Sequence, residues 1–187
     1  MIAIVDYKAG NLTSVRLAFD AIAIEAVPTA DPAVLARADR IVFPGVGAAA
    51  SAMANLRATG LIDTLRARIA AGVPFLGICL GTQILLDRSE EDGGVDALGV
   101  LPGTVRKFTP SEPACKIPHM GWNQVRAARL HPLLDGVPDG SDFYFVHSYY
   151  PDPADRGDVI GTTDYAGIVF ASMVGRGNVA ATQFHVE

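Results

Sequence analysis

Residues 75–83 read Phe-Leu-Gly-Ile-Cys-Leu-Gly-Thr-Gln and indicate most directly which fold this chain adopts. An apolar run enters this segment from Pro74 and a helical pattern follows over residues 81–87, which predicts a strand that turns sharply into a helix. Glycine two residues before and after Cys79 fits such a turn, because strained backbone at its centre crowds the neighbours. This is the pattern of a nucleophile elbow with cysteine as the nucleophile. A buried structural cysteine between packing glycines is the alternative interpretation.

Strands and helices alternate upstream of this segment. The strands we expect are 2–5, a second near 24–27, 40–43 and 74–78. The helices we expect are 12–22, an alanine-rich helix after Gly47, 61–71 and 81–87, and a short segment 32–38 lies between the second and third strands. Repeated strand–helix units of this kind predict an α/β fold with a mostly parallel central sheet and helices on both faces.

The pattern changes after about Gly93 to strands joined by turns. These expected strands are 104–108, 122–126, 142–149, 168–174 and 178–184. They predict an antiparallel extension of the parallel sheet. Because neither a linker nor an internal repeat separates the two halves, we expect residues 1–187 to form one domain.

Composition restricts the function classes. The chain has 187 residues, 50% of them hydrophobic, and a formal charge of −5, which disfavours nucleic acid or an anionic membrane as the main partner. Its two cysteines form neither a CxxC motif nor a cluster with histidine, so we expect reduced thiols, no metal and no organic cofactor. The start lacks a signal-peptide pattern and the apolar tract 73–86 is too short to span a bilayer, which predicts a cytoplasmic protein.

The predicted turn gives Cys79 a reactive setting. A cysteine at a helix N-terminus is favoured as thiolate, and the next amide, that of Leu80, would point toward an oxygen that develops negative charge. Among four histidines, His185 has a carboxylate two residues later, and on a strand its side chain and that of Glu187 project to the same face. Glu187 could then orient the imidazole as in a catalytic triad. A solvated pair near the end of the chain is the alternative.

Pro44-Gly-Val-Gly47 follows the expected third strand and should open at the same sheet edge as Cys79. The amide of Val46 or Gly47 could complete an oxyanion hole with Leu80. Taken alone, a Gly-x-Gly turn is as consistent with the entry to a helix.

Six spaced motifs together resemble a known family. They are Asp6-Tyr-Lys-Ala-Gly-Asn11, Pro44-Gly-Val-Gly47, Gly77-Ile-Cys-Leu-Gly-Thr-Gln83, Pro118-His-Met-Gly-Trp-Asn123, Phe145-Val-His-Ser-Tyr149 and Phe184-His-x-Glu187. The chain resembles the class I, triad-type glutamine amidotransferases over essentially its whole length. The first, fourth and fifth motifs make it similar to the glutaminase subunits of imidazole glycerol phosphate synthases.

The resemblance implies a role for each matching residue. Cys79 would be the nucleophile, His185 the general base and acid, and Glu187 its orienting partner, with oxyanion amides from Val46 and Leu80. The residues it places around glutamine are Gly45, Gly47, Gln83, His147, Ser148 and Tyr149. The implied reaction hydrolyses glutamine to glutamate and ammonia through a thioester. His147 could instead be an ordinary hydrogen-bonded strand histidine.

The resemblance also implies a partner. Such subunits form a heterodimer with a (β/α)8-barrel cyclase that uses the ammonia to make imidazole glycerol phosphate and AICAR in histidine biosynthesis. The residues it places at that interface are Asn11, Met120, Trp122 and Asn123. Trp122, the single tryptophan, could otherwise be a core or rim aromatic.

Two departures from the family bear on these expectations. Valine occupies position 186 where relatives usually carry proline, and the sequence stops at Glu187 where relatives continue into a lysine-serine pair and a helix. We therefore expect a truncated chain whose missing helix would cover apolar surface on the sheet.

Three other functions stay open. The chain could be the glutaminase of another synthase, such as those making pyridoxal phosphate, anthranilate or guanylate. It could also be a catalytically silent binding module with this fold. A stand-alone cysteine hydrolase or redox sensor is the third.

Overall fold

The computed structural model describes residues 1–109 and 115–187, and its β-structure forms two sheets. The strands of the larger sheet are β1 (Ile2–Val5), β2 (Ala26–Thr29), β3 (Arg40–Phe43), β4 (Phe75–Ile78), β8 (His119–Ala127), β9 (Ser141–His147), β11 (Val159–Tyr165), β12 (Ile168–Arg176) and β13 (Val179–Thr182). The strands of the smaller sheet are β5 (Arg88–Ser89), β6 (Val95–Asp96), β7 (Gly103–Lys107) and β10 (Tyr149–Pro153). The helices are α1 (Leu12–Ala21), α2 (Pro32–Leu35), α3 (Ala49–Ala58), α4 (Leu61–Ala70) and α5 (Leu80–Gln83), with short 3-10 turns η1 (Glu91–Gly93), η2 (Pro132–Leu134) and η3 (Arg156–Asp158).

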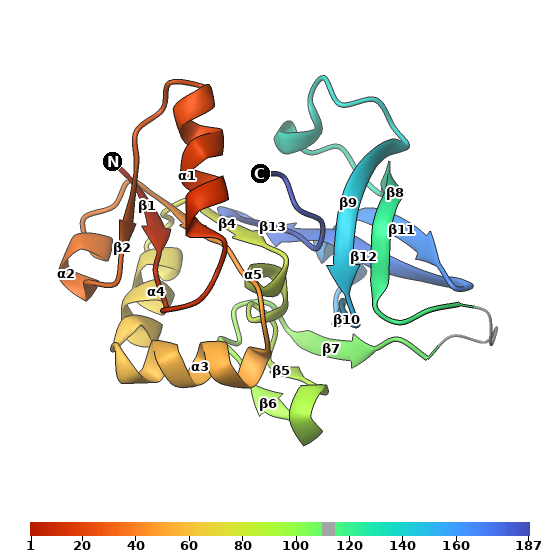
Figure 1. Ribbon diagram of the computed structural model, residues 1–187, viewed down its shortest axis with the longest axis horizontal. Coiled ribbons are helices and arrows are strands. Elements are labelled where there is room, and N and C mark those ends of the chain that lie inside the picture. The colour runs from red at the N-terminus through yellow and green to blue at the C-terminus, as the bar shows by residue number, and fades with distance from the viewer. Residues whose placement is uncertain (110–114) are drawn as a thin grey trace.

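The larger sheet runs through both halves of the chain (Figure 1). Its strand order is β2-β1-β3-β4-β13-β12-β11-β8-β9, and the order of the smaller sheet is β10-β7-β5-β6. The strands from β2 to β13 are parallel, and those from β13 onward to β9 pair antiparallel. The predicted parallel sheet with an antiparallel extension is confirmed.

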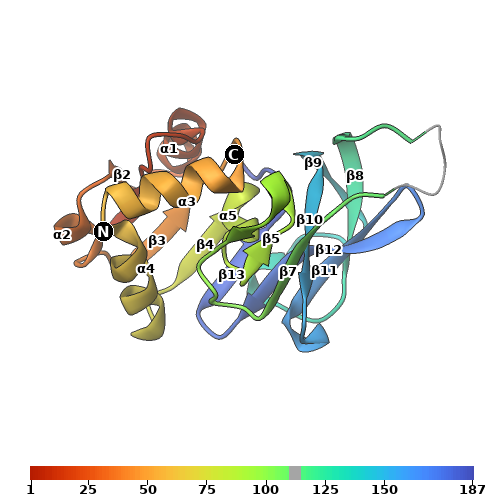
Figure 2. The same cartoon turned by 90° about the horizontal axis from the view of Figure 1, so that it is seen from below.

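Helices cover both faces of the parallel half because consecutive residues of a strand point to opposite sides. Ala3 and Phe43 belong to the core beneath α2, α3 and α4, whereas Ile4 and Val42 pack with Val15 of α1 on the other face. Figure 2 shows α3 and α4 on one side of the sheet and α1 on the other. Such apolar runs, buried on both faces, explain why these short strands were predictable.

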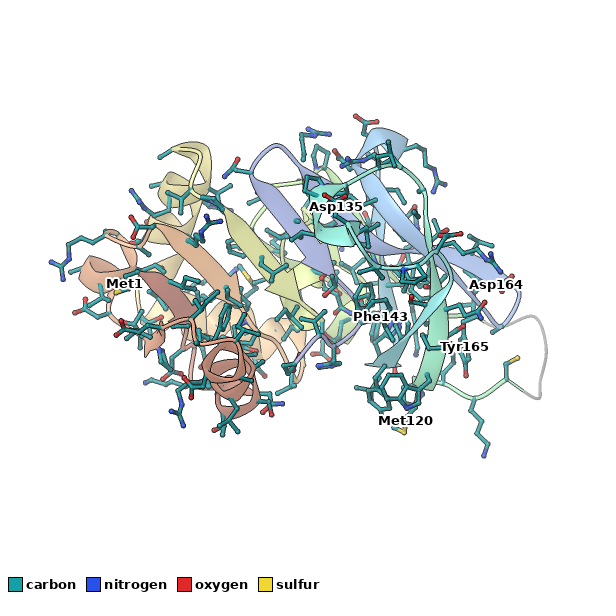
Figure 3. The ribbon with its side chains drawn as sticks, turned by 90° about the horizontal axis from the view of Figure 1, so that it is seen from above. Met1, Met120, Asp135, Phe143, Asp164 and Tyr165 are labelled. Carbon is teal, nitrogen blue, oxygen red and sulfur yellow. The ribbon has the colours of Figure 1, made fainter. Side chains whose placement is uncertain are left out.

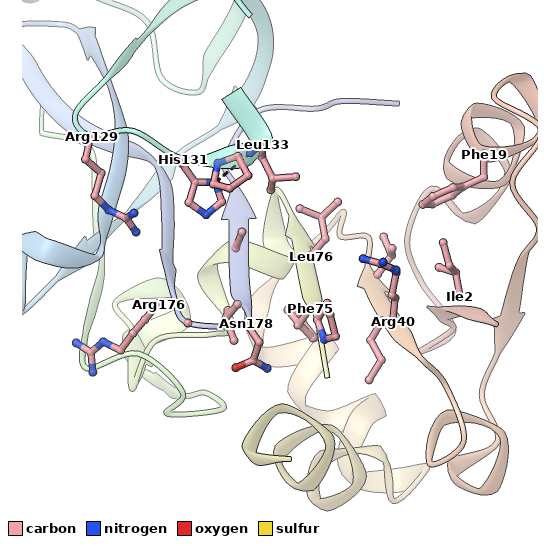
Figure 4. Close-up of a pocket in the computed structure, with 17 residues that line it drawn as sticks. Ile2, Phe19, Arg40, Phe75, Leu76, Arg129, His131, Leu133, Arg176 and Asn178 are labelled. Carbon is pink, nitrogen blue, oxygen red and sulfur yellow. Dashed lines mark hydrogen bonds between the residues drawn. The ribbon is translucent and has the colours of Figure 1, made fainter. Parts of the chain in front are cut away.

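The face that carries α1 is covered only in part. A groove of about 640 Å³ lies between α1 and η2, with Phe19, Leu76 and Leu133 among its lining residues (Figure 4). The arginines that line it are Arg40, Arg129 and Arg176, and His131 lies beside them.

Some predicted bounds were wrong. The second strand is Ala26–Thr29 rather than 24–27, and it tolerates Pro28 because β2 is an edge strand. The expected strand 142–149 is two strands that belong to different sheets, divided at Ser148. Strand β11 was not predicted, since its glycine and threonines weaken the apolar signal. The helix expected over 81–87 ends at Gln83.

The helices give no sign of membrane insertion. Within residues 1–109 and 115–187, none is both long enough and apolar enough to cross a bilayer.

Candidate active site

Cys79 lies at the junction of β4 and α5, where the elbow was predicted. Its backbone has φ 53° and ψ −105°, a conformation that residues other than glycine rarely adopt. Its amide donates to the Thr182 carbonyl on β13 at 2.7 Å, so two neighbouring strands hold the turn. A strained cysteine fixed in this way and 7% exposed fits the nucleophile interpretation better than that of a packing cysteine.

The glycines around Cys79 are required by close backbone contacts. A Cβ added at Gly77 would lie 2.6 Å from the Gly81 carbonyl oxygen, and one at Gly81 would collide with the Phe43 carbonyl. A Cβ at Gly45 would collide with Leu80. Gly45, predicted to contact glutamine, therefore packs against the elbow and does not line the cavity beside Cys79.

A cavity of about 360 Å³ opens beside Cys79. It brings together the predicted residues Val46, Gly47, Cys79, Leu80, Gln83, His147, Ser148, Tyr149 and His185. It also contains Glu91, Pro118 and Val146, which were not among the predicted site residues. The signals that could have indicated them were the acidic run Glu90-Glu91-Asp92 and the positions of Pro118 and Val146 inside two of the motifs.

His185 and Glu187 form the predicted pair. Nδ1 of His185 lies 2.9 Å from Oε1 of Glu187. The Cys79 side chain and the bond to Glu187 raise the pKa of His185 to about 10, against the opposite effect of burial. Burial would raise the pKa of Glu187, but the hydrogen bond from His185 lowers it overall. The imidazole is therefore protonated at neutral pH.

The second imidazole nitrogen is free for chemistry. Nε2 of His185 is buried and makes no hydrogen bond within the parts of the chain that the structure describes. With Nδ1 bonded to Glu187, Nε2 is the atom that can exchange protons with Cys79 and with a substrate.

The pair is not held by a regular strand, which corrects one expectation. Strand β13 ends at Thr182, two residues earlier than the predicted strand. Beyond it, the His185 amide donates to the Tyr144 carbonyl at 3.0 Å in an isolated bridge with β9. This bridge and the bond from Nδ1 to Glu187 fix the imidazole.

The two predicted oxyanion amides differ in their surroundings. Leu80 is the first residue of α5, directly after Cys79. The Val46 amide instead donates to the Tyr7 hydroxyl at 3.3 Å, and that hydroxyl donates back to the Val46 carbonyl at 3.3 Å. Burial raises the pKa of Tyr7 to about 12, so the phenol stays protonated. The Val46 amide would have to leave Tyr7 to bind an oxyanion.

His147 belongs to a buried hydrogen-bonded pair. Its Nδ1 lies 2.8 Å from the Tyr149 carbonyl, and its Nε2 lies 3.1 Å from Nδ1 of His119. Burial lowers the pKa of His147 to about 3 and that of His119 to about 4, so both rings are neutral. Nε2 of His119 then accepts from the Asn123 side chain, 3.2 Å away. The interpretation of His147 as a hydrogen-bonded strand histidine agrees with this arrangement, although His147 also lines the cavity.

The predicted partner-contact residues are largely at the surface. Met120 is 62% exposed and Trp122 is 73% exposed, so the interpretation of Trp122 as a core aromatic was wrong. The Trp122 ring stands edge-on to that of Tyr144, with centroids 5.9 Å apart. Asn11 is exposed and caps α1, and in Figure 3 Met120 projects toward the side of the molecule that carries α1.

Cys115 does not line the cavity beside Cys79. Cys79 and Cys115 are both free thiols, and Cys115 is only partly buried. Outside residues 110–114, which the structure does not describe, no three or more histidine, cysteine, aspartate or glutamate side chains gather as a metal site would need.

Comparison with known proteins agrees with this geometry. A family model described as glutamine amidotransferase class-I matches residues 7–187. Imidazole glycerol phosphate synthase subunit HisH of Dehalococcoides mccartyi is 48% identical over 187 residues, which are 100% of this chain and 89% of that protein. The protein of the same name from Moorella thermoacetica is 49% identical over 186 residues, 100% of this chain and 87% of the relative.

Solved structures with lower identity share the fold. A crystal structure of a glutamine amidotransferase superposes with a TM-score of 0.76 at 18% identity, covering 98% of this chain and 89% of the other. The structure of PurLQS from Thermotoga maritima gives a TM-score of 0.69 at 19% identity, covering 98% and 86%. The chain therefore belongs to the class I glutamine amidotransferase family, as its six motifs predicted.

Proposed function

We propose that this chain hydrolyses glutamine to glutamate and ammonia as the glutaminase subunit of an imidazole glycerol phosphate synthase in the cytoplasm. The observation that carries the proposal is the strained Cys79 beside the bonded His185–Glu187 pair in one cavity. The identity of 48% to a synthase subunit over the whole of this chain supports the choice of synthase. We propose that residues 1–187 act as a single amidotransferase domain.

The mechanism begins with a thiolate and a protonated imidazole. The Cys79 sulfur attacks the side-chain carbonyl carbon of glutamine, and the carbonyl oxygen takes up negative charge that the Leu80 amide at the start of α5 can stabilise. Nε2 of His185 gives its proton to the amide nitrogen, and ammonia leaves as the C–N bond breaks. The product of this step is a thioester on Cys79.

Water then cleaves the thioester. His185, now neutral, removes a proton from the attacking water, and the Cys79 sulfur leaves as thiolate while glutamate is released. Glu187 stays ionised throughout, since its bond to Nδ1 of His185 lowers its pKa, and it stabilises each imidazolium that forms.

The cavity also contains a group that could bind the amino-acid end of glutamine. Among the residues that line it, Glu91 supplies the only carboxylate, which suits the α-ammonium group of glutamine. One oxygen of Glu91 accepts from the Ala49 amide at 2.6 Å, so this carboxylate is fixed in place and retains a second oxygen for substrate.

We place the cyclase on the exposed end of β8 and β9. Met120, Trp122 and Tyr144 form an apolar patch there, and tryptophan and tyrosine are typical of the residues that anchor protein interfaces. The carbonyl of Tyr144 bonds to the amide of His185, so the patch and the site share one strand. A (β/α)8-barrel cyclase seated there would receive ammonia before water protonates it.

The direct test is glutamate release from glutamine by this chain, alone and with the matching cyclase and its nucleotide ligand, with Cys79→Ala as the control. We expect release that rises strongly with the cyclase and disappears in the variant. Activity only with the synthase subunit of another pathway would replace the proposed partner. No release in any mixture, while a glutamine-analogue electrophile fails to label Cys79, would favour a silent binding module.

A further inference from the structure

The Tyr149 carbonyl accepts two hydrogen bonds beside the cavity. Nδ1 of His147 lies 2.8 Å from it and Nε2 of Gln83 lies 2.9 Å from it. A carbonyl oxygen can only accept, so both partners must donate. The carboxamide of Gln83 is thereby oriented, with its nitrogen toward Tyr149.

The orientation of Gln83 fixes that of the next side chain. Nε2 of Gln83 also lies 3.0 Å from Oε1 of Gln183, so Gln183 must present its oxygen to Gln83. Its nitrogen then points the other way, where Nε2 lies 3.7 Å from Sγ of Cys79. Because the Tyr149 carbonyl can only accept, it fixes the orientation of the Gln83 carboxamide, and Gln83 in turn fixes that of the Gln183 carboxamide.

Gln183 is built into the core rather than placed at the surface. Its side chain is 0% exposed, and its amide donates to the Ser172 carbonyl on β12 at 2.8 Å. A buried carboxamide must satisfy its polar atoms, and here one of its hydrogens is directed at the reacting sulfur. Gln183 was not among the predicted site residues, although it immediately precedes the Phe184-His185 motif.

We propose that Gln183 is a further catalytic residue, whose side-chain N–H stabilises and orients the Cys79 thiolate. This inference rests on the proposed function, because it takes Cys79 as the nucleophile. Hydrogen bonds to charged groups are stronger than neutral ones, and this bond is made to the thiolate and lost when the sulfur becomes a thioester. The bond therefore favours the thiolate form of the resting enzyme and its return as leaving group.

The same chain of bonds connects the sulfur to the substrate cavity. Gln83 lines that cavity and is held between Tyr149 and Gln183, so a ligand that moves Gln83 also moves the donor to Cys79. A merely structural Gln183 would affect folding but not the protonation of the sulfur. The pH dependence of Cys79 reactivity separates these two roles.

The test compares Gln183→Glu and Gln183→Met with wild type by alkylation with iodoacetamide across pH, followed by mass spectrometry of the peptides. Both variants lack the N–H donor, and Met has a similar length without charge. We expect the pH midpoint of Cys79 alkylation to rise by about one unit in Gln183→Glu and by less in Gln183→Met. A rise of about one unit corresponds to an alkylation rate about tenfold lower at pH values below the midpoint. Cys115 of the same chain is the internal reference thiol.

Gln124→Glu is the matched control, because it adds the same charge at an exposed position on β8. Its Cys79 midpoint should equal that of wild type. Unfolding temperatures identify any variant that does not fold, and Gln183→Met decides the question if Gln183→Glu does not fold. An unchanged Cys79 midpoint in the folded variants would overturn the inference.

Glutamine turnover with the cyclase distinguishes this inference from the proposed function. We expect kcat of Gln183→Met to fall about tenfold with KM changed less than about threefold, since the bond is made to the nucleophile and not to glutamine. If wild type is active and kcat of Gln183→Met is unchanged, the role of Gln183 is overturned and the proposed function still stands. An inactive wild type would contradict the proposed function, and the alkylation midpoints would still decide the role of Gln183.

Discussion

The Tyr7 hydroxyl bonds to both ends of Val46, accepting from its amide and donating to its carbonyl, each at 3.3 Å. The Tyr7 ring stacks on Phe43 with centroids 4.9 Å apart, so the phenol has little freedom to follow if the Val46 peptide turns. The Val46 amide, the predicted second oxyanion donor, is thus bonded to a residue of the first strand–helix turn. If Val46 serves as an oxyanion donor, its amide must first leave the Tyr7 hydroxyl.

Removing that hydroxyl should raise the basal activity. Tyr7→Phe keeps the stacked ring and frees the Val46 amide, and a hydrogen bond of about 1 kcal/mol corresponds to about a fivefold increase in kcat of the isolated chain. Steady-state glutaminase assays without the cyclase measure this effect. A basal kcat equal to or below that of wild type, in a folded variant, would show that Tyr7 does not restrain the oxyanion hole.

Replacing the orienting carboxylate should remove most activity. Glu187→Gln keeps the shape but loses the charge that helps to raise the pKa of His185 to about 10. We expect kcat with the cyclase to fall at least about a hundredfold and the pKa of His185 to move down toward 6.5. Turnover assays and an NMR titration of His185 measure the two effects, and near-normal kcat would exclude a triad role for Glu187.

Acid stability should depend on the buried histidine pair. Burial lowers the pKa of folded His119 from 6.5 to about 4, so between these values the unfolded chain binds a proton that the folded chain does not. Stability is therefore lost as pH falls from 6.5 to about 4. His119→Phe, which keeps a ring between Phe145 and Tyr165, should reduce the loss between pH 7 and pH 5 by about 2 kcal/mol.

Urea unfolding at the two pH values checks this expectation. His147 remains in the variant and retains its own pKa of about 3, so part of the loss should persist. An equal loss in wild type and His119→Phe would mean that His119 is not neutral in the folded protein near pH 5.

The exposed tryptophan should matter for the partner and not for the fold. Trp122→Ala removes a side chain that is 73% exposed, and we expect Kd for the cyclase to rise about thirtyfold with little change in unfolding temperature. Leu130→Ala is the control, because Leu130 is 98% exposed on the turn after β8. Equal binding by Trp122→Ala and wild type, measured by calorimetry, would place the interface elsewhere.

Local sequence predicted the parts of this molecule that depend on neighbours along the chain. The apolar run before Cys79 and its flanking glycines predicted the elbow, because the turn is restricted by steric contacts among residues close together in the sequence. The division of residues 142–149 between two sheets, the bond from Tyr7 to Val46 and the bond from Gln183 to Cys79 all join distant segments. No local periodicity encodes such contacts, which explains why they were missed.

The pairing of β4 with β13 decides when the site can exist. The Cys79 amide is bonded to the Thr182 carbonyl, yet about a hundred residues separate the two, so the chain must close a long loop before Cys79 meets His185. A nascent chain that has emerged only as far as the elbow carries a cysteine with no imidazole beside it. During synthesis, we therefore expect the nascent chain not to hydrolyse glutamine until β13 has paired with β4.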